Sequence, residues 1–559
     1  MRNTVFLLIF FITTSFLSAQ SISEPLRQNR NVLVSSAGLP EEYLLFAPDT
    51  ATQILFNPAR GANYNGNFVY INYYSDNTTY PVYLTAMELN TTITPVYETG
   101  LSKATGSNIS DIYSFPSISE THYSSSSNPS FSIASLINCG TAKWLITFTN
   151  GIYKDENNYN SVSSDYTYYD SPYKNISKSG SFSNNKASST TIKAVRITGS
   201  GTDSYAIGVW GNFYTFTNIT NSSNNTYSKS LSDFFPDKIR DQNLTSYSES
   251  GTTRKNMSAG VEFSFNNINT DYIASIGYHY SKTPKNRNTY SDIAYIDSLT
   301  ENDNTKTFYS NNREYYATNG NAGGNTDGIS LYNYLGYSTG WITPKDNIFI
   351  SLYGYFCEGD KYFDDQYTYE NKYTYMDNAP YTTSFSRTFQ NKIKGKDRGV
   401  YLTTGYAARL ILNDIYLMSG IKLQGALRES RDITGQLNSS TTSTFSEYKL
   451  TDRTADFIVP LYIYYSPENW VSIYGGFNFI YRYTYQKYDL ATQNRKHQLS
   501  SSYIAKDYYT ESNNSGWNSS KNIYAGFELK HSSGLRVQTF FTSEFTDLKY
   551  WNVSVGYNF

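Results

Sequence analysis

The chain has 559 residues and a net charge of −2, and only 16% of its residues are charged. Soluble domains carry about 25% charged residues, and nucleic-acid-binding domains are usually strongly basic, so the composition argues against a nucleic-acid partner. Aromatic residues make up 17%, with 57 Tyr against 32 Phe. Because tyrosine has an apolar ring and a polar tip, this excess is typical of membrane–water interfaces and of sheets with one face in water.

The first 19 residues predict a secretory signal peptide. Arg2 supplies the positive start, residues 5–17 are mostly apolar, and cleavage is expected after Ala19. After this segment the sequence contains no apolar run of about 18 residues, the length that a membrane-spanning helix needs. Any insertion into a membrane must therefore use strands closed into a barrel.

Residues 20–66 do not alternate between apolar and polar positions. Pro58 cannot lie in the middle of a sheet, so we expect a turn-rich element without strands. Its apolar side chains must still be buried, and the lumen of a barrel is the obvious place. These side chains are Leu44, Leu45, Phe46, Ile54, Leu55 and Phe56.

From residue 67 onwards, apolar and polar residues alternate in about sixteen segments of roughly 8–15 residues, the reach of a tilted membrane strand. In residues 551–559, every odd position is apolar and every even position is small or polar. The pattern predicts an all-β fold, a transmembrane antiparallel up-and-down barrel of about 14–16 strands. Pro460 falls inside one segment, and we expect a bulge there.

The connections between these segments alternate between short and long. Outer-membrane barrels have short periplasmic turns and long extracellular loops, so the alternation predicts both termini in the periplasm of a bacterium. A β-sandwich or propeller would need shorter and more even spacing. The segment 367–375 alternates well enough to continue a hairpin above the membrane, and a solvated loop is the equal alternative. The long connections are 75–129, 157–189, 217–254, 282–327, 357–398, 428–455 and 486–520.

Residues 47–60 resemble the N-terminal hatch of the FadL/TodX-type outer-membrane transporters and of PorV-like barrels. In those families an Asp–Ala/Ser stretch leads to an aromatic residue and then to Asn-Pro-Ala. The matching positions are Asp49, Ala51, Thr52, Phe56, Asn57, Pro58 and Ala59. Arg60 stands where the family usually has Gly, and the family has fourteen strands. The resemblance implies a hatch over residues 20–66, a barrel over residues 67–559, and a gate near Phe56.

Two further sets of residues follow from the predicted barrel. Tyr557 and Phe559 end the chain in the way of the signal that the barrel-assembly machinery reads. Charged side chains at membrane depth must face the lumen and usually pair. They either line a pore or form ion pairs that stiffen the barrel, and we favour ion pairs for most of them. The candidates are Glu262, His279, Arg409, Lys422, Gln424, Arg482, Glu528, Lys530, Arg536 and Gln538.

The sequence offers no basis for an enzyme. Its four histidines have no partner at a catalytic spacing, and no metal-ligand cluster, phosphate loop or dinucleotide motif is present; we therefore expect no catalytic residue, cofactor or metal. The leading hypothesis is a porin-like transporter or channel for small hydrophobic molecules. The alternatives are a PorV-like module that holds a surface protein by its extracellular loops, and a structural surface barrel. In all three cases we expect contact with outer-membrane lipids.

Overall fold

The computed structural model describes residues 39–74, 77–83, 113–114, 117–127, 130–140, 142–168, 173–200, 202–231, 239–300, 306–341, 343, 346–375, 381–437, 442–496, 506–542 and 552–559. The predicted signal peptide, residues 1–19, lies outside this part of the chain, as do residues 20–38 of the predicted hatch segment. Within the described ranges, no helix is long and apolar enough to span a membrane.

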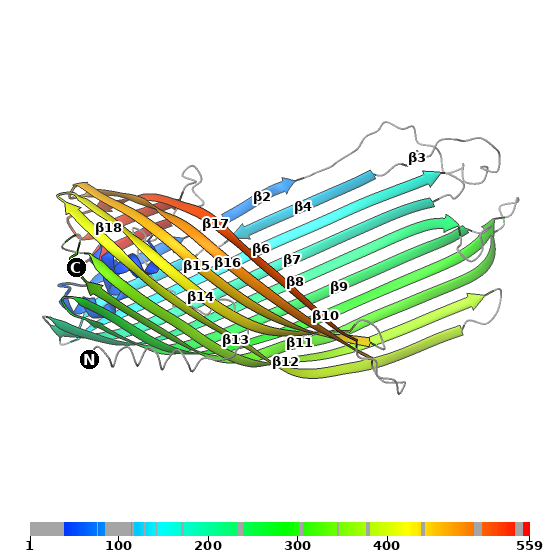
Figure 1. The fold of residues 1–559 in the computed structure, drawn as a ribbon. Helices are drawn as coiled ribbons and strands as arrows, with labels where there is room; N and C mark the ends of the chain where they lie inside the picture. Colours follow the sequence, from blue (N-terminus) through cyan, green and yellow to red (C-terminus); the bar gives the residue numbers. More distant parts are fainter. Residues whose placement is uncertain are drawn as a thin grey trace.

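The strands form one closed antiparallel barrel with a wall of sixteen strands (Figure 1). This confirms the predicted fold class at the upper end of its strand count. The wall begins with β1 (Phe68–Tyr74) and β5 (Ser130–Asn138), above which β2 (Asn77–Tyr83), β3 (Tyr113–Ser114) and β4 (Ser117–Ser127) extend the sheet. It continues with β6 (Lys143–Tyr168), β7 (Tyr173–Ser200), β8 (Asp203–Leu231), β9 (Ile239–Asn266), β10 (Thr270–Thr300), β11 (Lys306–Ser338), β12 (Asn347–Tyr375), β13 (Tyr381–Leu412), β14 (Ile415–Leu437), β15 (Thr442–Glu468), β16 (Val471–Lys496), β17 (Lys506–Lys530), β18 (Leu535–Thr542) and β19 (Asn552–Asn558).

The barrel closes between the first and the last strand. β1 pairs with β19 over its whole length, from Phe68 opposite Asn558 to Tyr74 opposite Asn552. Just outside these strands, the backbones of Asn67 and Phe559 exchange two hydrogen bonds of 2.8 and 3.0 Å. Closure pairs the two edges that an open sheet would leave exposed.

Side chains on the wall alternate between an apolar outer face and a buried lumenal face. On β8, Tyr205, Ile207 and Val209 are 45%, 65% and 60% exposed. The even-numbered Ala206 and Trp210 of the same strand are buried. The exposed apolar side chains gather near the short turns. Such a band, facing outwards near one end of a closed barrel, is the lipid-facing belt of outer-membrane proteins.

The hairpins continue as sheet far beyond this belt. β12 has 29 residues; a strand of that length is about 95 Å long and, at a tilt of ~40°, rises about 70 Å, whereas the apolar belt of such barrels is about 25 Å tall. Of the two interpretations of segment 367–375, the hairpin extension is correct, because these residues all lie in β12. Most of the long connections are therefore strand, and β6 to β13 project furthest (Figure 1).

The bulge expected at Pro460 is not present. The register between β14 and β15 is the same before and after this proline, from Ser419 opposite Leu461 to Lys422 opposite Ile458. The ladder skips the positions between them, because proline has no N–H to donate. On the other side of the strand, Pro460 stays in register opposite Asn478 of β16.

Residues 39–66, the described part of the chain before the barrel, form three short helices inside the lumen, at the end where the short turns lie (Figure 1). They are η2 (Glu41–Phe46), α2 (Thr50–Phe56) and η3 (Pro58–Asn63). Asp49 caps α2 by accepting a hydrogen bond of 3.2 Å from the backbone N–H of Thr52. Asn57 caps η3, with Pro58 in the first helical position, where its missing N–H costs nothing.

Candidate functional site

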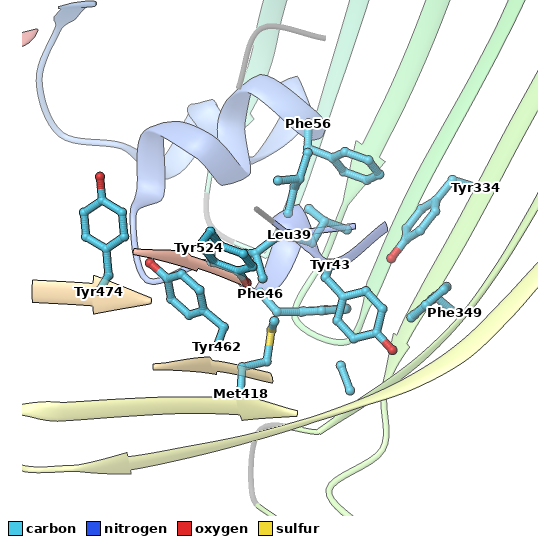
Figure 2. Close-up of a cluster of buried hydrophobic side chains, with 14 of the residues drawn as sticks. Leu39, Tyr43, Phe46, Phe56, Tyr334, Phe349, Met418, Tyr462, Tyr474 and Tyr524 are labelled. Atoms are coloured by element: carbon cyan, nitrogen blue, oxygen red, sulfur yellow. The ribbon is translucent and has the colours of Figure 1, made fainter. Parts of the chain in front are cut away.

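Residues 39–63, which we call the hatch, pack against the inner face of the wall. Its η2 end lies in a hydrophobic cluster with one side chain from each of nine consecutive strands, β10 to β18 (Figure 2). These are Ile273, Tyr334, Phe349, Ala407, Met418, Tyr462, Tyr474, Tyr524 and Phe540. Its α2 and η3 residues pack on the remaining arc, against side chains of β1 and β5 to β8. Through these two clusters the hatch packs against fourteen of the sixteen strands of the wall.

Phe56, the predicted gate residue, is central to this packing. It is 1% exposed, and its ring meets that of Tyr334 edge-to-face at 5.1 Å between centroids (Figure 2). Such a pair adds about 0.5–1.5 kcal/mol to the contribution of burial. Ala59 is buried on the opposite arc, and its backbone N–H lies 3.2 Å from the hydroxyl oxygen of Ser264 on β9.

A buried ionic network ties η3 to β10. Nε and one terminal nitrogen of Arg60 donate to the two carboxylate oxygens of Asp271 at 2.9 and 2.6 Å. The amide of Asn57 donates to the same carboxylate at 2.7 Å, and Arg60 also donates to the side chain of Gln53 at 2.6 Å. Two-pronged pairing of this kind fixes geometry as well as charge. Arg60, the residue that differs from the Gly of the hatch pattern, therefore fixes η3 to the wall.

A second ion pair ties η2 to β14. Lys422 Nζ lies 2.6 Å from a carboxylate oxygen of Glu42, and the two side chains are 5% and 4% exposed. Tyr43 beside it donates a hydrogen bond of 3.0 Å to the backbone oxygen of Tyr406 on β13. Removal of either member of a buried ion pair leaves the other charge buried without a partner, which costs about 3–5 kcal/mol.

Two further polar contacts connect the hatch to the wall. Arg536 on β18 lies 3.6 Å from the Asp49 carboxylate, and burial raises the pKa of Asp49 although the charge of Arg536 opposes that shift. Lys143, the first residue of β6, donates to the backbone oxygens of Gly61, Ala62 and Tyr64 at 3.1, 2.8 and 2.5 Å. It thus adds a side-chain donor to carbonyl groups at the end of η3, of which that of Gly61 also accepts from the backbone N–H of Tyr64.

The four charged wall residues that hold the hatch lie a quarter of the circumference apart. They are on β6, β10, β14 and β18, and in the closed order of sixteen strands each is four strands from the next. We call Lys143, Asp271, Lys422 and Arg536 the four anchors. Because they surround the hatch, they hold it to the wall from four sides of the lumen.

Tyrosines fill the lumen at this level by lying across glycines on the neighbouring strand. Tyr474 lies over Gly526, and Tyr524 over Gly476, each directly opposite in the pairing of β16 with β17. A Cβ atom on Gly526 would lie 2.1 Å from a backbone oxygen. Glycine at these positions lets the rings lie flat on a curved sheet.

The structure places the other predicted lumenal residues inside the barrel, most of them with partners. Glu262 accepts a hydrogen bond of 2.5 Å from Lys193, and both side chains are buried. His279 lies between two hydroxyl groups, 2.8 Å from Ser258 and 2.6 Å from Ser330. No acidic partner for this imidazole has been found among the described residues, and neither has a group of three or more side chains able to hold a metal.

The remaining candidates cluster near the short turns or pair along the wall. Glu528 accepts hydrogen bonds from Tyr464 at 2.7 Å and Gln538 at 3.1 Å, and lies 3.5 Å from Lys530 and 3.4 Å from Arg536. Higher on the wall, Arg482 donates to both oxygens of Asp456 at 2.7 and 2.8 Å. Arg409 lies over the ring of Phe46, 5.3 Å from its centroid. Gln424 is half-buried.

Lys422 and Arg536 were predicted from the sequence to be lumenal residues, but the other charged residues that hold the hatch were missed. Glu42 and Lys143 were not singled out, and neither was Asp271. Asp271 has a detectable signal, since it shares the odd-numbered face of β10 with His279 and lies one residue into its strand. No pattern in the sequence links it to Arg60, 211 positions earlier.

Comparisons with known proteins give a weak structural likeness alone. No family model and no curated protein matches the sequence. Among solved structures, the toluene transporter TbuX of Ralstonia pickettii is 9% identical, with 91% of this chain and 92% of that chain covered and a TM-score of 0.27. The toluene transporter TodX of Pseudomonas putida is 10% identical, with 90% and 91% covered and a TM-score of 0.21. The E. coli receptor Fiu is 7% identical, with 89% and 82% covered and a TM-score of 0.19. Scores this low carry no argument about function.

The fold and the site together define the class. A closed sixteen-stranded barrel with an apolar outer belt is an outer-membrane β-barrel. Its lumen contains a folded N-terminal segment of the same chain.

Proposed function

We propose that this protein is a transporter or channel for small hydrophobic molecules, with the hatch as its gate. The supporting observation is that the hatch is held inside the lumen by separate polar contacts at four anchors, which can break and re-form, together with apolar packing. In this proposal the short turns and both termini face the periplasm. The long hairpins then face outwards, and the ligand enters between them.

The preference for hydrophobic ligands follows from the surface that the hatch covers. The wall behind η2 presents the rings of Tyr334, Phe349 and Tyr462, which pack on the hatch (Figure 2). If the hatch moves, these rings become available to a passing molecule. Aromatic rings offer large apolar contact areas, and the hydroxyl groups of tyrosine can also meet polar atoms.

A reversible lock tests the gate in the intact chain. Cysteines at Ala59 and Ser264 bring together hatch and β9, because these residues are already in hydrogen-bond contact; the exposed native Cys139 is replaced by serine. Oxidation should abolish ligand-dependent conductance in planar bilayers, and reduction should restore it. A second variant lacking residues 20–66 should conduct constitutively. If the oxidised, reduced and deleted forms conduct alike, the hatch is not a gate.

A second function is supported by one separate feature, the height of the hairpins. Strands such as β11, with 33 residues, extend far beyond what a membrane requires and present a Tyr- and Asn-rich surface suited to protein binding. A PorV-like barrel that holds a surface protein would use this region. Shortening β12 and β13 above residues 360 and 394 should then abolish capture of that protein while conductance persists. Loss of conductance with unchanged capture would count against this alternative.

A further inference from the structure

A row of four cations runs along the outer face of β13. Lys392, Lys394, Lys396 and Arg398 occupy alternate positions of one strand, so their side chains point to the same side of the sheet. We call them the cationic row. Among the described strands, none of the others carries four basic residues at successive positions of one face.

The cationic row continues the lipid-facing belt. Further along the same face of β13, Leu402 and Leu410 are 48% and 43% exposed, and they belong to the apolar belt. Arg398 follows two positions above Val400, so the change from apolar to basic occurs within a few residues. From Arg398 to Lys392 the strand extends about 20 Å, or about 15 Å in height at the usual tilt. The row therefore stands at the level where lipid headgroups meet the barrel.

Carboxylates on the neighbouring strands pair with the cationic row without outnumbering it. Lys392 lies 2.7 Å from Asp360, Lys396 lies 3.2 Å from Glu358, and Nε of Arg398 donates to Glu429 at 2.8 Å. Lys392 is 71% exposed, and exposed pairs of this kind contribute about 0–1 kcal/mol and weaken with salt. Lys392 and Lys396 can thus exchange a carboxylate for a phosphate at little cost.

The cationic row has one more charge than the three carboxylates that pair with it. Among the described carboxylates none forms an ion pair with Lys394, whose side chain is exposed. The pKa of Asp360 is lowered, first by its hydrogen bond with Lys392 and also by the charges of Lys392 and Lys394. Phosphates carry more charge than a carboxylate and accept several hydrogen bonds, so they are the anions that best fit four aligned donors.

We propose that the cationic row binds the phosphorylated headgroups of the outward-facing lipid leaflet. Basic residues at the edge of a membrane belt reach anionic headgroups while their stems lie against the apolar surface. The continuity of the row with Leu402 selects lipid over a protein partner. A lipid bound here would hold β12 to β14 at a fixed depth in the membrane.

The test compares the mature barrel with a variant in which Lys392, Lys394, Lys396 and Arg398 are all replaced by glutamine. Both are placed in neutral-detergent micelles, and doped diphosphorylated lipid A serves as the probe. Binding is measured by the rise in the thermal unfolding temperature as the lipid is titrated. We expect half-saturation of the variant to require about tenfold more lipid. Lipid A without its phosphates should raise neither protein's unfolding temperature.

A charge-matched control separates the row from net charge. The control replaces four other exposed lysines, spread over three strands, with glutamine, and it should bind like the unmodified protein. These are Lys154, Lys178, Lys186 and Lys372. A variant with arginine at the three row lysines should retain binding. Equal loss in the row and control variants, unchanged binding in the row variant, or an equal temperature rise with inorganic phosphate alone would each overturn the proposal.

Discussion

Replacement of Lys422 by methionine should release the hatch. The substitution keeps the length of the side chain but leaves the Glu42 carboxylate, 4% exposed, without the ammonium group that lies 2.6 Å away. A buried charge that has lost its partner costs about 3–5 kcal/mol, which corresponds to an about 150- to 5,000-fold higher population of undocked hatch. The barrel itself should remain folded, because its strands keep their backbone ladders.

Single-channel recording in planar bilayers measures this population as the fraction of time in which the pore is open. The double variant Glu42→Gln with Lys422→Met should recover most of the closed state, since no charge is then left unpaired. Arg398→Met is the matched control, because it breaks an ion pair of similar geometry on the outer face and should change the open fraction less than fivefold, for at most about 1 kcal/mol. An unchanged open fraction in Lys422→Met, or a double variant as open as the single one, would refute this reasoning.

The other predictions concern the packing of hatch and wall. Asp271→Asn should increase protease cleavage within the hatch at least tenfold, because Arg60 loses its two-pronged charged partner. Phe56→Ala should loosen the hatch by about 3–5 kcal/mol through the cavity left beside Tyr334, seen as faster hydrogen exchange in residues 50–63 with unchanged exchange in the wall. Gly526→Val should prevent assembly of the barrel, because its Cβ would lie 2.1 Å from a backbone oxygen; a heat-modifiable band on gels as strong as that of the unmodified protein would contradict this.

The fold was predictable because a barrel wall imposes a period of two on the sequence. On β8 the odd residues Tyr205 and Ile207 are exposed, as the alternation requires. The ends of the strands were not predictable in the same way. Above the belt the outer face no longer meets lipid, so segments such as 357–375 lose their apolar outer face while their backbone ladder continues. Composition there resembles a loop although the structure is sheet.

The lumenal residues of the site could be predicted from the sequence only in part. The alternation of side chains along each strand is enough to place Lys422 and Glu528 on the lumenal face, because a charge facing lipid is too costly. This alternation does not show which residues form ion pairs. The pairing of Glu42 with Lys422 and that of Asp271 with Arg60 therefore do not follow from the sequence. The tyrosines show the same limit. Their abundance suggested interfaces, yet several of the largest fully buried side chains are tyrosines that lie across glycines of the next strand, which depends on register.

The four anchors are unequal, and their inequality suggests how a gate would move. The contacts of Lys422 and Asp271 are short and buried, whereas Arg536 is 30% exposed and lies 3.6 Å from Asp49. A contact of that length is weaker than the 2.6 Å contacts of Lys422 and Asp271. The start of α2 should therefore leave the β18 side of the wall first, while the contacts at β10 and β14 act as the pivot. Such a motion opens the lumen beside Glu528, where Lys530 and Gln538 already supply the polar groups that would meet incoming water.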